Sequence, residues 1–506
     1  MRSLLLLLLM AGPAAAACGP TGLYEGTAEA GPPPRAEVTL NLYCEGGALK
    51  AQIFTDSGDF KVLSVTAEGG HTKLHIDTYA ALADVDLTSQ GDTLSGTVDV
   101  AGEKGAIALT RKSDSPGANA LLPRLDLSPA QWREDLDALA RELPKRHANA
   151  FFFLKKPEFD ARVAVLRAKL DRLNGDEAFV AFSQIVNAIG DGHTVIVPPK
   201  DRADLPLELA MFGDDIRVVG AGTAYANLLG TKVIAIGGVP VREAFAREMT
   251  LTPSQELPEL RNGRVVVYLA RGLTLHGLGI TPDRDHALYT VRDDRGRVFT
   301  ADVKTLGAGE EAKLKSLYPA GMLSRQNPDD PFWCRQTGDA LYCAWHSYQD
   351  LKAKMEKMHA LIAQTHPKKL IVDMRDNGGG DNTVGDALLI KPLKADAYFN
   401  VKGRLYVLVG PLTFSAAMNN AAQFQDETNA ILVGETIGEK PNSYQEPRQF
   451  RLPNSHIVVR VSTLYYAFRK HGENAVRPEK EIIPSWADVK AGRDPVLEWV
   501  LRQPVR

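Results

Sequence analysis

The stretch LIVDMRDNGGG, residues 370–380, decides the fold class. Its first half, LIVDM, is an apolar run interrupted only by Asp373, which is typical of a strand buried on both faces of a parallel sheet. Two further runs of this kind, LYVLV at 405–409 and ILV at 431–433, follow with helical stretches between them. Strands that alternate with helices predict an α/β core, which we place at residues 335–506.

A turn containing glycine follows each of these strands, at the position where α/β sheets bind their ligands. In the first turn, three consecutive glycines at 378–380 allow backbone N–H groups to converge on an anion. No Lys-Ser/Thr pair follows the glycines, which argues against a nucleotide-binding loop.

The second turn places Ser415 between an apolar strand and a helical stretch. A hydroxyl in this position is exposed, and the helix N-terminus favours negative charge that develops beside it. Ser415 is therefore a candidate nucleophile, although a serine at this position is also a common helix N-cap. The third turn, 434–442, is by itself a polar loop.

Residues 125–200 predict a helical subdomain. Ser128 and Pro129 form a cap followed by proline at the first helical position, and apolar residues recur at helical spacing in three segments. The third segment ends in GDGHT, residues 190–194. This glycine-containing exit presents His193 at a helix C-terminus.

The rest of the chain predicts β structure, so the whole is a multidomain α+β protein. Residues 18–113 alternate apolar and polar positions between glycine turns, which indicates an all-β barrel or sandwich. Residues 201–305 are β-rich and partly resemble a PDZ domain, a module that binds peptides by adding them to a sheet edge. A simple β insertion is the alternative for this region.

The first 17 residues predict a signal peptide, because a short apolar run follows Arg2 and small residues follow the run. The mature chain is then extracytoplasmic. Cys18 lies where a lipid anchor is attached in lipoproteins, which would tether the chain to a membrane. The even number of cysteines favours instead two disulfides, Cys18 with Cys44 and Cys334 with Cys343.

Composition argues against several kinds of ligand. A net charge of −3 with both signs interspersed does not favour nucleic acid. The sequence has neither the His-Glu-x-x-His nor the Cys-x-x-Cys spacing, so no metal site is predicted. No nucleotide or other cofactor is predicted, and the oligomeric state stays open.

The order of these motifs resembles the tail-specific, or C-terminal processing, serine peptidases of family S41, in particular their tricorn-like branch. The resemblance runs from about residue 128 to the C-terminus and leaves out the N-terminal β domain. The segments that carry it are 191–194, 371–380, 413–416, 433–436, 473–479 and 492–498.

The resemblance implies a crotonase/ClpP-like core and a catalytic set of Ser415, His193 and Glu473. It also implies an oxyanion hole formed by the backbone N–H groups of Gly379 and Ala416. In that branch a histidine takes the serine proton, and imidazole has a suitable pKa for this role.

Two features leave the base and its orientation open. A second branch of the family uses a lysine, for which Lys440 is the alternative; alignment on Thr436-x-Gly438, however, puts Glu439 at the lysine position. Gly192 replaces the serine that precedes the histidine in the tricorn-type pattern. Asp191 is therefore an alternative to Glu473 for orienting the His193 ring.

We expect a serine peptidase that cleaves peptides or proteins through an acyl-enzyme in the bacterial cell envelope. One alternative is a non-catalytic protein that binds peptides or lipophiles on the same fold. A second is that the N-terminal β domain is the functional part.

Overall fold

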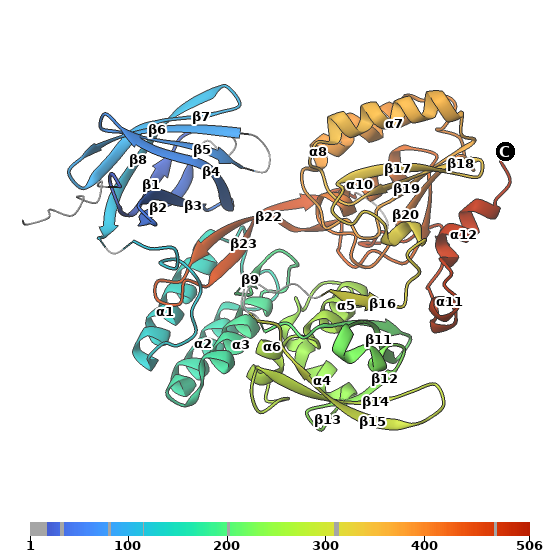
Figure 1. The fold of residues 1–506 in the computed structure, drawn as a ribbon, viewed down its shortest axis with the longest axis horizontal. Coiled ribbons are helices and arrows are strands. Elements are labelled where there is room, and N and C mark those ends of the chain that lie inside the picture. Colours follow the sequence, from blue (N-terminus) through green and yellow to red (C-terminus); the bar gives the residue numbers. More distant parts are fainter. Residues whose placement is uncertain are drawn as a thin grey trace, which may run out of the picture. The chain divides into compact units, whose positions relative to one another are not determined.

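The computed structural model describes residues 18–30, 35–78, 82–114, 116–199, 203–307, 313–469 and 473–505. The predicted signal peptide lies outside these residues. The chain divides into two units, Met1–Leu122 with Arg448–Phe450, and Pro123–Pro447 with Arg451–Arg506 (Figure 1). No helix in the described ranges combines the length and the apolar character that crossing a membrane requires.

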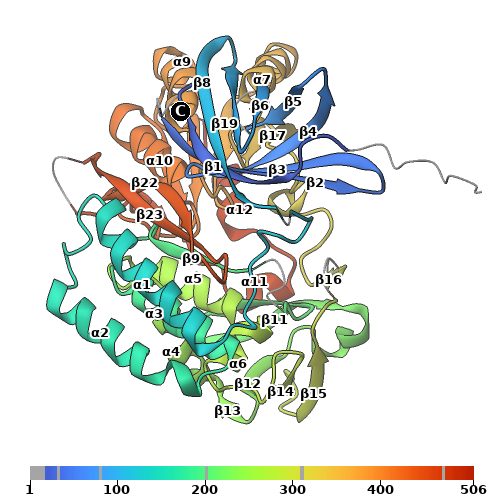
Figure 2. The same ribbon diagram turned by 90° about the vertical axis from the view of Figure 1, so that its left-hand side faces the viewer.

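The first unit is a closed barrel in which each strand is antiparallel to the next and β8 pairs with β1 (Figure 2). Alternate side chains, among them Leu40, Leu87 and Leu109, point inward and form an apolar core. Of the two predicted architectures, the barrel is confirmed. Its strands are β1 (Gly22–Ala28), β2 (Ala36–Glu45), β3 (Ala48–Thr55), β4 (Asp59–Glu68), β5 (His71–Asp77), β6 (Leu82–Gln90), β7 (Thr93–Val100) and β8 (Glu103–Ser113).

Both predicted disulfides are present. Cys18 is bonded to Cys44 of β2, so the start of the barrel is tied to its second strand. A lipid thioether would need the same Cys18 sulfur, and lipid anchoring stays an untested prediction.

The second unit begins with three helices, α1 (Pro129–Arg146), α2 (Lys156–Lys169) and α3 (Gly175–Asn187). The predicted cap is confirmed: Ser128 and Gln131 form a reciprocal capping box, and Pro129 is the first residue of the helix. The three-stranded sheet β22-β23-β9 joins this subdomain to the core. Its strands are β22 (Asn442–Arg451), β23 (Val458–Ala467) and β9 (Val195–Val197).

The β-rich region forms its own sheet around an apolar core. The strand order is β10-β11-β12-β14-β15, with β13 paired to β12 and β16 paired to β11. The elements are β10 (Leu207–Phe212), β11 (Asp215–Gly222), β12 (Lys232–Ile236), β13 (Val239–Pro240), α4 (Val241–Glu248), α5 (Pro258–Tyr268), α6 (Gly272–Gly277), β14 (His286–Arg292), β15 (Val298–Lys304) and β16 (Leu314–Ser316).

The core sheet has the order β17-β18-β19-β20-β21-β24, and the strands from β18 onward are parallel. All three apolar runs of the sequence are therefore strands of one parallel sheet, as predicted. These elements are β17 (Phe332–Thr337), β18 (Ala340–Trp345), α7 (Leu351–Thr365), β19 (Lys369–Asp373), α8 (Asn382–Gly385), α9 (Lys391–Ala395), β20 (Leu405–Val409), α10 (Ala416–Glu427), β21 (Ile431–Gly434), β24 (Lys480–Glu481), α11 (Trp486–Lys490) and α12 (Pro495–Arg502).

Helices cover both faces of this sheet. Helices α7 and α10 pack on one face, through Met358 and Met418, while Val500 of α12 packs on the other (Figure 1). The strands are thus buried on both sides, which explains why their sequences show no alternation.

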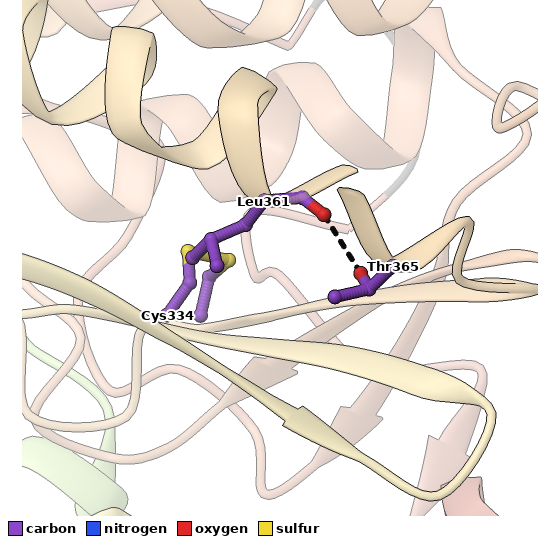
Figure 3. The surroundings of a disulfide bond; sticks show 4 residues. Cys334, Leu361 and Thr365 are labelled. Carbon is purple, nitrogen blue, oxygen red and sulfur yellow. Dashed lines mark hydrogen bonds between the residues drawn. A yellow bond between two sulfur atoms is a disulfide. The ribbon is translucent and has the colours of Figure 1, made fainter. Parts of the chain in front are cut away.

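The second disulfide joins Cys334 of β17 to Cys343 of β18, which lie directly opposite each other in the hairpin. Figure 3 shows the bond against α7, where Leu361 packs beside it and accepts a hydrogen bond of 2.7 Å from the Thr365 hydroxyl. The bridge therefore holds the antiparallel edge of the core sheet beneath a helix.

Candidate active site

Ser415 lies in the turn between β20 and α10. Its φ of 56° and ψ of −126° put a non-glycine residue in a sparsely populated conformation, which costs about 1–3 kcal/mol. The sequence left open whether this serine caps the helix; its side chain makes no capping hydrogen bond within the described residues. The hydroxyl is therefore available for another role.

The glycine turn that follows β19 lies directly against Ser415. Gly379 has a φ of 106°, and a Cβ added there would be 2.7 Å from the Ser415 Cβ. The Thr413 hydroxyl donates a 2.9 Å hydrogen bond to the carbonyl of Met374, which joins the two turns. The structure thus brings the candidate nucleophile and the triple-glycine turn together, and only glycine fits at 379.

The two predicted oxyanion donors differ in their present partners. Ala416 is the first residue of α10, where helix geometry leaves the backbone N–H without an intrahelical acceptor. The Gly379 N–H donates a 2.9 Å hydrogen bond to Oδ1 of Asn377. A substrate oxyanion would have to replace the Asn377 side chain as the acceptor of this second donor.

His193 is held in place through its backbone. Oδ1 of Asp191 accepts hydrogen bonds from the N–H groups of His193 and Thr194, at 3.1 and 2.8 Å. Its Oδ2 lies 2.9 Å from Nε2 of His147. Although burial opposes it, the contact with His147 holds the pKa of the Asp191 carboxyl below its usual value. Asp191 therefore positions the turn, not the imidazole ring.

The His193 ring is buried and stacks on Phe414, the residue before Ser415, with ring centroids 4.5 Å apart. Burial lowers the pKa of His193 to about 4, against the opposing charge of Asp191. Neither ring nitrogen has a hydrogen-bond partner among the described residues. The imidazole is therefore neutral near pH 7, and the hydrogen bond between base and nucleophile is not made in this structure, as is common in enzymes without substrate.

Glu439 lies beside both Ser415 and His193, although it was not among the predicted site residues. Its carboxylate is fully buried, and Oε2 accepts a hydrogen bond from the Ser415 N–H. The other oxygen, Oε1, lies 3.4 Å from Nδ1 of His193. Burial, reinforced by the charge of Glu256, raises the pKa of Glu439 well above its usual value.

Glu256 is a second buried carboxylate that the sequence reasoning missed. It accepts hydrogen bonds from the N–H groups of Gly192, at 2.8 Å, and of Lys440, at 3.1 Å. Burial raises the pKa of Glu256 to about 7. Arg264 donates a 3.1 Å hydrogen bond to the Gly192 carbonyl and lies over the Phe414 ring. These contacts join the turns that carry His193 and Glu439.

No hydrogen bond or ion pair within the described residues joins the other two predicted side chains, Glu473 and Lys440, to His193 or Ser415. The Glu473 side chain is 71% exposed, and its carboxylate lies 2.7 Å from Nε of Arg477. Lys440 is half-buried, and no hydrogen bond within the described residues joins its amino group to Ser415. The described residues also hold no cluster of His, Cys, Asp and Glu side chains that could bind a metal ion.

Comparison with known families gives one match. Residues 383–482 match the model of peptidase family S41, and this segment contains Ser415, Glu439 and Glu473. The resemblance to family S41 is thereby confirmed, and the tricorn-like branch stays a prediction. No curated protein sequence matches the chain.

The fold is similar to that of mature CPAF solved in complex with lactacystin, with a TM-score of 0.53 and 13% sequence identity over 74% of this chain and 97% of CPAF. A second structure of mature CPAF gives a TM-score of 0.51 and 13% sequence identity, over 74% of this chain and 96% of CPAF. The alignment with the tricorn protease covers 92% of this chain and 45% of the tricorn chain, with 13% sequence identity and a TM-score of 0.38. At this identity the likeness to CPAF shows a shared fold.

Proposed function

We propose that this member of peptidase family S41 hydrolyses peptide bonds through an acyl-enzyme formed on Ser415. The observation that carries the proposal is the contact between two turns. A strained serine with no capping role lies against Gly379, in a turn whose backbone amides can bind an anion. Next to them is a buried, neutral histidine with no hydrogen bond to its ring within the described residues.

In the proposed reaction the Ser415 Oγ attacks the substrate carbonyl carbon while Nε2 of His193 takes the hydroxyl proton. The N–H groups of Ala416 and Gly379 hold the negative oxygen of the tetrahedral intermediate. The C–N bond then breaks as His193 returns the proton to the leaving amine. Water, activated by the same imidazole, hydrolyses the Ser415 ester.

His193 is the proposed base in preference to Lys440. A neutral amine at neutral pH requires a desolvated lysine, whereas Lys440 is half-buried. The position beside the Ser415 backbone is occupied by Glu439, which cannot act as a lysine would. The imidazole, in contrast, is buried and packs against the residue that precedes the nucleophile.

We propose that the mature chain works outside the cytoplasm. Its two disulfides are of the kind that persist in oxidising compartments, and the first 17 residues have the pattern of a signal peptide. The substrate class is then a peptide or an unfolded protein segment of the cell envelope.

The test compares the wild type with Ser415→Ala, His193→Ala and Lys440→Ala in cleavage of fluorescently labelled casein. We expect the first two variants to lose at least about 10³-fold in kcat/KM, with Lys440→Ala close to wild type. Full activity of a folded Ser415→Ala variant would reject the acyl-enzyme. If Lys440→Ala lost activity and His193→Ala kept it, the lysine would be the base.

A further inference from the structure

Glu439 joins the nucleophile and the base through one carboxylate. Oε2 binds the backbone N–H of Ser415, and Oε1 lies 3.4 Å from Nδ1 of His193. Both side chains are almost completely buried, with 5% of His193 and none of Glu439 exposed. The distance of 3.4 Å is slightly longer than a hydrogen bond, so a small rotation of the ring is enough to make one.

The other candidate carboxylates are engaged elsewhere. Both oxygens of Asp191 bind backbone N–H groups, the Ser462 hydroxyl or His147. Both oxygens of Glu256 bind backbone N–H groups. Glu473 lies at the surface and pairs with Arg477. Among the described residues, Glu439 is the carboxylate placed to act on the imidazole.

We propose that Glu439 is the positioning residue that selects the tautomer of His193, a role that rests on the proposed function. An ionised Glu439 accepts the proton of Nδ1, so Nε2 keeps its lone pair and can take the proton of Ser415. A protonated Glu439 donates to Nδ1 instead, and the ring proton then lies on Nε2, where the imidazole cannot act as a base.

The groups around Glu439 set its pKa, and therefore the pH at which His193 changes from one tautomer to the other. Burial, the charge of Glu256 in its ionised form and the charge of Asp191 favour the protonated carboxyl of Glu439, whereas the Ser415 N–H and Arg264 favour the ionised form. Arg264 and Arg460 also act on His193, where they disfavour the imidazolium. Because the net effect raises the pKa of Glu439, catalysis is gained as pH rises through that raised value.

The distinguishing experiment uses Glu439→Gln, with Glu473→Gln as the matched control at the carboxylate that the family pattern names. A glutamine at 439 can still accept from the Ser415 N–H, but its NH₂ then faces Nδ1 and forces the unproductive tautomer. At a pH above the raised pKa of Glu439, where the wild-type carboxylate is ionised, we expect a loss of about 10³–10⁴-fold in kcat with little change in KM, as for the corresponding exchange in serine proteases. We expect Glu473→Gln to stay within about threefold of wild type.

Two further readouts separate positioning from a structural defect. Nitrogen-15 NMR of the His193 ring should show the proton on Nδ1 in the wild type above the Glu439 pKa and on Nε2 in Glu439→Gln, whether or not a peptide is cleaved. The acid limb of kcat/KM in the wild type should lie well above pH 4, the value expected if His193 titrated alone. An unchanged melting temperature shows that the variant is folded.

The outcomes are distinguishable. Wild-type turnover in Glu439→Gln, with Ser415→Ala inactive, overturns the role of Glu439 and leaves the peptidase intact. Loss confined to Glu473→Gln assigns orientation of the ring to Glu473 and also overturns the inference. Full activity in Ser415→Ala overturns the proposed function itself, and the nitrogen spectrum then tests the tautomer by itself.

Discussion

Three buried carboxylates hold the backbone of the site, and they come from separate parts of the chain. Each accepts backbone N–H groups beside a residue of the proposed mechanism: Asp191 binds those of His193 and Thr194, Glu256 binds those of Gly192 and Lys440, and Glu439 binds that of Ser415. Hydrogen bonds to an ionised carboxylate, as in Asp191, are stronger than those between neutral groups. The positions of nucleophile and base therefore depend on side chains that need not touch the substrate.

The close approach at Gly379 gives a prediction for single residues. Gly379→Ala puts a Cβ 2.7 Å from that of Ser415 at a φ of 106°, where a side chain is strained. The turn must shift, and its N–H leaves the oxyanion. We expect a loss of about 10²–10³-fold in kcat, the usual effect of losing one such donor.

The neighbouring glycine provides the control for this prediction. A Cβ at Gly378 meets no atom of the described residues within 4 Å. Gly378→Ala should therefore keep kcat within several-fold of wild type in the same casein assay. Equal activity of the two alanine variants would show that the Gly379 N–H does not contribute to the oxyanion hole.

The sequence predicted residues whose local pattern is distinctive. Ser415 follows a buried strand, the glycines at 378–380 are consecutive, and His193 lies in the glycine-containing turn that follows a helical segment. Glu439 carried only a weak signal, its alignment with the lysine of the other branch. Glu256 carried none, because a buried carboxylate in a loop is recognisable only after the fold has closed around it.

At the scale of the elements, an ion-pair cluster anchors the turn after β19. Arg375 contacts Asp373 at the end of that strand, at 2.6 Å, and Asp494, the N-cap of α12, at 2.8 Å. The Tyr342 hydroxyl donates to the same Asp373 carboxylate. The cluster ties the strand that leads to the triple glycine to the C-terminal helix.

Arg375→Met should therefore be strongly destabilising. It leaves two largely buried carboxylates without their counter-ion, which costs about 3 kcal/mol or more. Denaturant unfolding measures the loss. The control is Arg477→Met, because Arg477 is 56% exposed and pairs with an exposed glutamate; we expect a change of about 0.5 kcal/mol or less. Similar effects for both variants would contradict the role of the cluster.

Helix α4 ends at a buried carboxyl that should make stability depend on pH. Burial raises the pKa of Glu248 from 4.5 to about 8. Between these values the folded chain holds a proton that the unfolded chain has lost, so the free energy of unfolding falls as pH rises, by about 3 kcal/mol at pH 7.

Glu248→Gln removes this penalty. Thermal unfolding should show a higher melting temperature than wild type at pH 8 and little difference at pH 4. A difference that is the same at both pH values would show that Glu248 does not titrate in this range.

Periodicity predicted the elements better than their pairing. The three apolar runs, the Ser128 cap and the three helices after it are all present. The pairing of β9 with β23 was not predictable, because β9 is only three residues long, the paired residues are more than 260 positions apart, and tertiary packing chooses the partner. That pairing holds the chain directly after His193.

At the scale of the whole molecule, the barrel and the peptidase unit each have their own apolar core. The side chains of the proposed mechanism all lie in the second unit. The Cys18–Cys44 disulfide belongs to the barrel, and the Cys334–Cys343 disulfide belongs to the core sheet. Each bridge should therefore stabilise its own unit.

A double variant, Cys18→Ala with Cys44→Ala, tests this division. Loss of the bridge should destabilise the barrel by about 3 kcal/mol and leave kcat/KM for a short peptide within about twofold of wild type. Calorimetry and a peptide assay on the same sample provide the check. A large loss of activity in the folded variant would mean that the barrel takes part in catalysis.

The central claim is that Ser415 is an activated nucleophile, and labelling by a fluorophosphonate tests it most directly. Peptide mass spectrometry of the labelled full-length chain should find the phosphonate on Ser415, with labelling lost in Ser415→Ala and slowed by orders of magnitude in His193→Ala. A folded wild-type chain that remains unlabelled, or is labelled at another serine, would contradict the account.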